Sequence, residues 1–203
     1  MKMYQDIEEK IQELKLISPS PDRMFVLNQL IEYIKNKQVN QQEVLLNFIC
    51  THNSRRSQMA QVWASLLAQY YGVGLKAYSG GTEATAFHPN ALSVFRRLGL
   101  EIDKHGEENP HYVLKYSQDQ PAIVVFSKLY NHTSNPRENF VAIMTCAEAD
   151  VNCPFIPEAD QRISLTYEDP KEFDGTENAV EAYRFCADQI ASEMNYVFQN
   201  LAE

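Results

Sequence analysis

Apolar residues recur at two different periods along the chain, and the period changes near residue 41. The first helix is indicated by four apolar residues at helical spacing, namely Met3, Ile7, Ile11 and Leu14. After a Pro- and Ser-rich break at residues 18–22, a second apolar face runs over residues 25–34. Because two such helices cannot bury both faces alone, we expect residues 1–40 to be a helical N-terminal extension that packs on the main domain or on a partner chain.

From residue 43 onward, short apolar runs alternate with helical patterns. The apolar runs are residues 44–49, 75–79, 122–126 and 140–144. The helical patterns are residues 56–71, 89–98 and 176–200. Strands alternating with helices predict an α/β domain over residues 41–203, a three-layer sandwich with a central four-stranded parallel sheet and helices on both faces.

Charge and hydropathy exclude several classes of partner. The formal net charge is −9, so we expect no binding to nucleic acid or to an anionic membrane surface, which favour a basic face. The sequence contains no apolar stretch of about 18 residues, so we predict no membrane span. The charged, amphipathic N-terminus lacks the apolar core of a signal peptide, so we predict a cytoplasmic protein. The oligomeric state is not predicted.

The residues from Cys50 to Ser57 join a predicted strand to a predicted helix. A tight loop at a helix N-terminus points several backbone N–H groups into one concavity, which suits an oxyanion. The helix dipole and Arg56 favour the thiolate form of Cys50, and Arg56 can grip a tetrahedral oxyanion with two hydrogen bonds. Ser57 can donate its hydroxyl to the thiolate, and Asn53 tolerates a left-handed backbone. The loop therefore predicts nucleophilic attack by Cys50 on a tetrahedral oxyanion.

Two further segments carry candidate chemistry. Glu168 and Asp169 are adjacent carboxylates in a loop-like sequence, and either could supply a proton to a leaving oxygen. Cys146 follows a predicted strand end, where the active sites of parallel sheets gather, and Cys153 lies seven residues later. Zinc binding is disfavoured by this spacing, which leaves two inert core thiols or a thiol–disulfide relay. Cys186 is predicted to be a core thiol, and no role is assigned to His88.

At this point a family resemblance becomes visible. The stretch CTHNSRRSQMAQ, residues 50–61, resembles the Cys, five residues, Arg, Ser loop of low-molecular-weight protein tyrosine phosphatases and of the thioredoxin-coupled arsenate reductases built on the same fold. The resemblance covers roughly residues 43–203. Both families place an Asp-Pro pair late in the chain with the Asp facing the nucleophile, which implies that Asp169 is the acid.

The second pair of cysteines distinguishes the two families. The segment CAEADVNCPFIP, residues 146–157, resembles the redox segment of the arsenate reductases, and plain phosphatases of this fold do not carry it. The resemblance implies that Cys146 attacks Cys50, that Cys153 then attacks Cys146, and that a thioredoxin-like protein reduces the resulting disulfide. It also implies that Arg56 and the loop residues bind the oxyanion; these residues are Thr51, His52, Asn53, Ser54 and Arg55.

The chain departs from the family pattern at three positions. The family loop usually has Gly where this chain has His52, so His52 is expected to alter the loop or narrow its mouth. The family often has Cys where this chain has Arg55, which is expected to be a solvated surface residue. Some arsenate reductases hold a potassium ion with an acidic residue where this chain has Gln61, although Asn53 and Ser79 match other ligands. We therefore predict neither a metal ion nor an organic cofactor.

Three hypotheses follow for the function. The leading one is an arsenate reductase in which Cys50, Arg56, Ser57 and Asp169 act on arsenate, and Cys146 and Cys153 pass on the disulfide. The alternative is a low-molecular-weight phosphatase that hydrolyses phosphotyrosine or a small phosphate ester through a phospho-cysteine intermediate. The third is a non-catalytic oxyanion- or redox-sensing module that signals through its helical extension.

Overall fold

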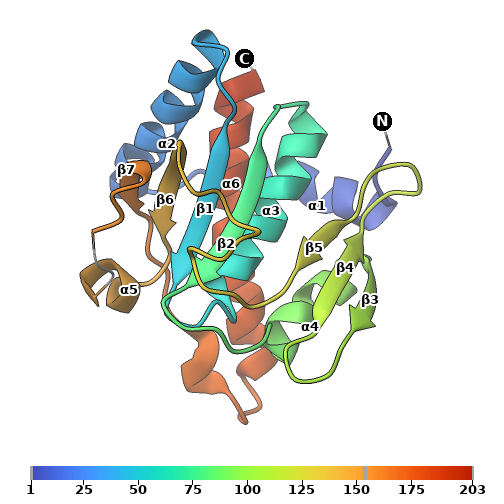
Figure 1. Cartoon of the computed structure of the whole chain (residues 1–203). Helices are drawn as coiled ribbons and strands as arrows, with labels where there is room; N and C mark the ends of the chain where they lie inside the picture. The colour runs from blue at the N-terminus through green and yellow to red at the C-terminus, as the bar shows by residue number, and fades with distance from the viewer. Residues whose placement is uncertain (1, 153–154, 203) are drawn as a thin grey trace.

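A four-stranded parallel sheet forms the centre of the computed structural model, which describes residues 2–152 and 155–202 (Figure 1). The strand order is β2-β1-β6-β7. The strands are β1 (Leu45–Cys50), β2 (Lys76–Gly81), β6 (Phe140–Met144) and β7 (Ala159–Ser164). Helices flank this sheet, so the predicted fold class is confirmed.

Three helices pack together against one face of the sheet. They are α2 (Pro21–Val39), α3 (Arg56–Tyr71) and α6 (Ala179–Ala202). The α3 helix ends where predicted, at Gly72, whose positive φ of 68° suits glycine better than any residue with a Cβ. The remaining helices are α1 (Gln5–Leu14), α4 (Pro89–Arg97), α5 (Ala147–Asn152) and the short 3₁₀ helix η1 (Pro170–Phe173).

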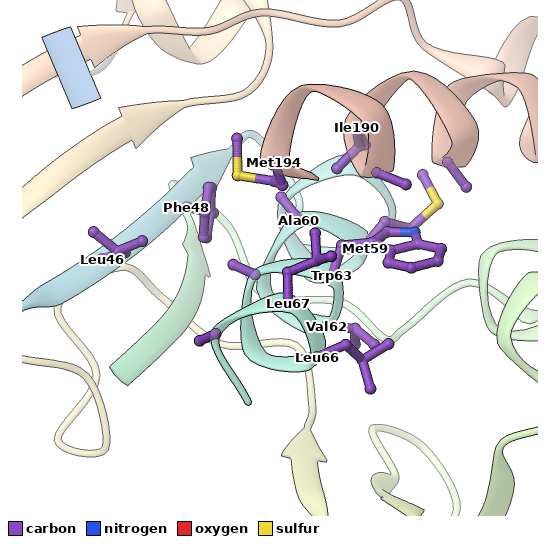
Figure 2. Close-up of a cluster of buried hydrophobic side chains, with 14 of the residues drawn as sticks. Leu46, Phe48, Met59, Ala60, Val62, Trp63, Leu66, Leu67, Ile190 and Met194 are labelled. Atoms are coloured by element: carbon purple, nitrogen blue, oxygen red, sulfur yellow. The ribbon is translucent and has the colours of Figure 1, made fainter. Parts of the chain in front are cut away.

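The main hydrophobic core lies between the sheet and these helices. Leu46 and Phe48 of β1 point toward α3 and α6, where Trp63 and Met194 are among the buried partners (Figure 2). Because side chains alternate along a strand, Ile49 points to the opposite face. There it joins a smaller cluster with Phe140, Ala142 and Met144 of β6 and with Cys146 and Ala149 around the start of α5. Cys50, the last residue of β1, belongs to this cluster too, so the two thiols pack in the same group of buried side chains.

The two N-terminal helices contribute to the main core. Ile7, Ile11 and Leu14 of α1 are fully buried, as are Leu27, Leu30 and Ile34 of α2. Phe25 was expected on the buried face, but it is 72% exposed, because its helical position is on the face opposite the buried Leu27 and Ile34. The boundary between an extension at residues 1–40 and a domain at residues 41–203 stays a prediction.

A second sheet was not expected. It is antiparallel and consists of β3 (Glu101–His105), β4 (His111–Lys115) and β5 (Ile123–Val125) in that order. The apolar run at residues 122–126 therefore supplies a strand to this sheet and not to the parallel one. The fourth parallel strand is β7, whose sequence ADQRIS alternates between half-buried and exposed positions with only Ile163 fully buried, as expected of an edge strand.

In the part of the chain that the structure describes, no helix has the length and apolar character needed to cross a membrane.

Candidate active site

Cys50 is the last residue of β1, and the loop that follows it leads directly into α3 (Figure 1). Cys50 is buried, and its Sγ lies 3.0 Å from Ser57 Oγ. Ser57 Oγ also accepts a hydrogen bond of 2.8 Å from Asn53 Nδ2. Because the Ser57 oxygen already accepts this hydrogen, its own proton is available to Cys50, so the geometry suits a serine that stabilises a thiolate.

Asn53 holds the centre of the loop in shape. Its φ is 45°, in the left-handed region expected from the sequence. Its side chain is fully buried, and its Oδ1 accepts a hydrogen bond of 2.9 Å from the backbone N–H of Lys128. Its carbonyl oxygen accepts a hydrogen bond from Gln58 Nε2. The hydrogen bonds of Asn53 to Ser57, Gln58 and Lys128 therefore anchor the loop before any ligand binds.

The carbonyl oxygens of the loop accept hydrogen bonds from groups outside it. The donors are Thr82 N to Cys50 O, Glu83 N to Thr51 O, Ser127 Oγ to His52 O and His88 N to Ser54 O. The neighbouring strand β2 makes this close approach possible because it ends in glycine. A Cβ on Gly81 would lie 2.6 Å from Thr51 O and 2.7 Å from Asn53 N.

Arg56 connects the loop to the segment that carries Asp169. Its Nη1 donates to Tyr167 O at 2.9 Å, and its Nη2 donates to Asp169 Oδ2 at 2.5 Å. Arg56 Nε is buried and finds no acceptor among the residues that the structure describes. An unsatisfied buried donor at the end of the loop that follows Cys50 is available to an oxyanion ligand. Asp169 itself caps η1 by accepting from Lys171 N at 3.0 Å.

Comparison with known proteins now decides the family. The family model described as low molecular weight phosphotyrosine protein phosphatase matches residues 45–203. The chain belongs to this family. The match begins at the first residue of β1, so α1 and α2 lie outside it.

The relatives to which the chain is similar include arsenate reductases. One from Bacillus subtilis (strain 168) is 30% identical over 133 residues, which cover 66% of this chain and 78% of that protein. A solved arsenate reductase in the phosphate binding state is 20% identical, with a TM-score of 0.52 and coverage of 78% of this chain and 98% of that one. A low molecular weight protein tyrosine phosphatase from T. tengcongensis is 15% identical, with a TM-score of 0.50 and coverage of 78% and 100%. At these identities the two structures show the fold alone.

A second thiol lies beside the phosphatase-family loop. Cys146 follows β6, is 1% exposed, and its Sγ is 3.5 Å from Thr51 Oγ1. The first turn of α5 holds it, because Ala149 N donates to the Cys146 sulfur at 3.3 Å. Thr51 Oγ1 also donates to Glu148 Oε2 at 3.1 Å. Cys153, its predicted relay partner, lies outside the described residues.

Arg55 was expected to be a solvated surface residue, and this was wrong. Its side chain is 12% exposed, and its Nη2 donates to Asp174 Oδ2 at 2.7 Å. Its Nε donates to the hydroxyl of Tyr183, which in turn donates to Asp174 Oδ1 at 2.8 Å. The Arg55 side chain turns inward because it binds a carboxylate and a phenol that lie more than 100 residues later in the sequence.

His88 belongs to the same cluster, although the sequence indicated no role for it. Its ring stacks on Tyr183 with 5.3 Å between centroids, and its Nδ1 lies 3.1 Å from the Tyr183 hydroxyl. Partial burial and the neighbouring charge of Arg55 lower the pKa of His88. Partial burial raises the pKa of Asp174, but hydrogen bonds from Tyr183 and Arg55 outweigh it and lower that pKa overall. The cluster therefore favours a charged Asp174 and a neutral His88.

Three other expectations concern His52, Cys186 and a potassium ion. His52 Nε2 points to Glu83 at the rim of the loop, 3.4 Å from Oε2. Cys186 is a buried core thiol as predicted, and burial raises its pKa to about 12. The groups expected to face potassium are already paired, since Gln61 Oε1 accepts from Ser79 at 2.6 Å and Asn53 Oδ1 accepts from Lys128 N. Gln61 also brings no carboxylate, so the acidic ligand that the resemblance associates with potassium is absent at this position.

Proposed function

We propose that this protein is an arsenate reductase that uses Cys50 as nucleophile and passes a disulfide through Cys146 and Cys153 to an external dithiol. The observation that carries the proposal is the second thiol, Cys146, held against Thr51 in the loop that follows Cys50. A phosphatase reaction at Cys50 has no use for this thiol. The arsenate reductase name of the Bacillus subtilis relative supports the same conclusion.

Binding begins at the loop between Cys50 and Arg56. The loop carbonyls bond outward, and we infer that the amide N–H groups line the inside of the loop and bind arsenate. We assign this role to the N–H groups of residues 51–56, so Arg55 contributes only its backbone. The guanidinium of Arg56, with its free Nε, exchanges Asp169 for arsenate oxygens. This exchange releases Asp169 to act as the acid.

The first chemical step is attack by the Cys50 thiolate on arsenic. A sulfur–arsenic bond forms, one oxygen of arsenate leaves, and Asp169 protonates it so that it departs as water. Ser57 stabilises the thiolate before the attack through the 3.0 Å contact with Cys50. The product of this step is a Cys50 thioester-like adduct of As(V).

The second step reduces the arsenic. The Cys146 thiolate attacks the Cys50 sulfur, the electron pair of the sulfur–arsenic bond passes to arsenic, and arsenite leaves. Two thiols have then become one Cys50–Cys146 disulfide, which balances the two-electron reduction of As(V) to As(III). Cys153 next attacks Cys146, restores the Cys50 thiol and leaves a Cys146–Cys153 disulfide. A thioredoxin-like protein reduces that bridge, which places the enzyme in the reducing cytoplasm.

Serine variants of the relay cysteines test the proposal. Cys146→Ser and Cys153→Ser are expected to lose multiple-turnover arsenate reduction with thioredoxin, because neither can close the final disulfide. Cys186→Ser is the matched control, because it makes the same substitution at a buried cysteine whose donor to Glu168 O a hydroxyl can replace, and it should keep wild-type turnover. Wild-type turnover in Cys146→Ser or Cys153→Ser would refute the relay.

The second candidate is hydrolysis of phosphotyrosine or a small phosphate ester. The Arg56–Asp169 pair supports it, because thiolate, guanidinium and acid suffice for a phospho-cysteine intermediate. In this case Cys146→Ser and Cys153→Ser hydrolyse an aryl phosphate as fast as the wild type, and the intact protein reduces no arsenate. If the intact protein turns over neither substrate yet binds a partner, the non-catalytic sensing module is favoured instead.

A further inference from the structure

One arginine of the N-terminal helices contacts the segment that carries the acid. Arg23 lies in the first turn of α2, outside the residues matched by the family model. Its Nε and Nη2 donate to the two carboxylate oxygens of Glu193 on α6, at 2.8 and 2.7 Å. Glu193 is 3% exposed, so this bidentate pair is fixed in the core and not a mobile surface contact.

The remaining part of the Arg23 guanidinium reaches the backbone that follows β7. Arg23 Nη1 donates to Thr166 O at 3.0 Å, and its guanidinium carbon lies 5.0 Å from the centroid of the Tyr167 ring. Tyr167 is buried, so the ring cannot move away from this contact without disturbing the core. One side chain of α2 thus holds both residues 166 and 167.

The next residues along the same segment belong to the site. Tyr167 O accepts from Arg56 Nη1 at 2.9 Å, and Asp169 follows two residues later. The segment is also bonded to the residue that follows β6, with Tyr167 N donating to Thr145 O at 3.2 Å. The acid segment is therefore held between two arginines, one from the oxyanion loop and one from α2.

We propose that Arg23 is a positioning residue that sets Asp169 against the oxyanion loop, so that the N-terminal helices are a working part of the active site. Arg23 acts through Thr166 and Tyr167 and touches no reacting atom. The inference rests on the proposed role of Asp169 as proton donor. Through Arg23, residues 1–40 would help to position the acid, a role that their apolar faces alone did not indicate.

The test compares Arg23→Met with Lys37→Met in the full chain. Lys37 is another cation of α2 and pairs with Asp160 at 2.8 Å, but this pair lies at the end of α2 remote from Arg23. Both variants lower the melting temperature. Only Arg23→Met is expected to raise amide hydrogen exchange in peptides covering residues 165–174, and equal exchange in the two variants would overturn the proposal. This readout needs no activity, so it stands even if the proposed function fails.

A double-mutant cycle measures the effect on turnover. Arg23→Met should lower kcat by on the order of tenfold to a hundredfold, as small misplacements of catalytic groups do, while the Kd of inorganic phosphate changes less than about twofold. In the Asp169→Asn background the same change should add less than about twofold, because the acid is already absent. A full additional loss in that background would overturn the inference. If neither arsenate nor an aryl phosphate is turned over by the wild type, the proposed function fails and the exchange experiment decides the inference.

A second variant guards against loss of the fold. Arg23→Met leaves Glu193 buried without its partner, which is costly. Arg23→Met combined with Glu193→Gln removes both charges and keeps the volume, and it should show the same loss of kcat and the same local exchange. A double variant with wild-type kcat and wild-type exchange would contradict the role of Arg23.

Discussion

Lys128 is an ammonium buried beside the oxyanion loop, and its replacement by methionine should stabilise the fold. Lys128 is 4% exposed and pairs with no carboxylate among the residues that the structure describes. Its Nζ donates to Phe126 O at 3.4 Å and lies 4.6 Å from the centroid of the Phe126 ring. Burial lowers its pKa from 10.5 to about 8. The charge is therefore held in the fold at a cost.

The size of this cost follows from the change in pKa. At about 1.4 kcal/mol for each tenfold change in proton affinity, the drop from 10.5 to about 8 corresponds to about 3 kcal/mol. Methionine has a similar length and no charge, so it fills the same space. The lost hydrogen bond and ring contact offset part of the gain, which leaves an expected increase in the free energy of unfolding of about 2 kcal/mol.

The pH dependence gives this prediction a sign that can be checked. The folded pKa is lowered, so the cost is fully present below pH 8 and disappears as the pH rises toward the unfolded value of 10.5. Urea unfolding of Lys128→Met and the wild type between pH 6 and 10.5 should show the largest difference at low pH. A variant less stable than the wild type at pH 7, or a difference that does not shrink above pH 8, would refute the reasoning.

Three further changes probe the loop and its supports. Gly81→Ala places a Cβ against Thr51 O and should destabilise the fold by about 1–3 kcal/mol. Binding of inorganic phosphate, measured by calorimetry, should be lost, and an unchanged affinity would contradict the tight packing of the loop. Asp174→Asn leaves Arg55 without its carboxylate, so urea unfolding should show a loss of about 1–3 kcal/mol, and a loss near zero would show that the pair is solvated. Because the pKa of His88 is lowered in the folded state, the stability of the wild type should fall as the pH drops below about 6.5. His88→Asn keeps an acceptor that caps α4, and thermal melts at pH 5–7.5 should show that it loses this pH dependence.

The part of the site that is local in sequence could be predicted. A strand, a loop and a helix lie consecutively between residues 45 and 71, and the left-handed residue Asn53 and the helix end at Gly72 follow from residue type. β1 is a continuous apolar run that is buried along nearly its whole length, and α3 is a long helical pattern that ends at a glycine, so both can be recognised without knowledge of their distant partners.

Contacts between distant segments could not be predicted in the same way. Arg55 contacts Asp174 and Tyr183 only in the folded chain. The sequence around Arg55 contains nothing that identifies these distant partners. The strand β7 was missed because an edge strand with alternating polar residues lacks a continuous apolar run. The antiparallel sheet was missed because β3 is mostly exposed and gives no apolar pattern.

Mass spectrometry after a single turnover tests the central claim most directly. The reduced protein is mixed with arsenate in the absence of any external dithiol, quenched with acid and an alkylating agent, and digested. The proposed mechanism predicts one arsenite per chain, a Cys146–Cys153 disulfide, and an alkylated Cys50 and Cys186. Arsenite release with Cys146 and Cys153 both alkylated, or no arsenite at all, would contradict it.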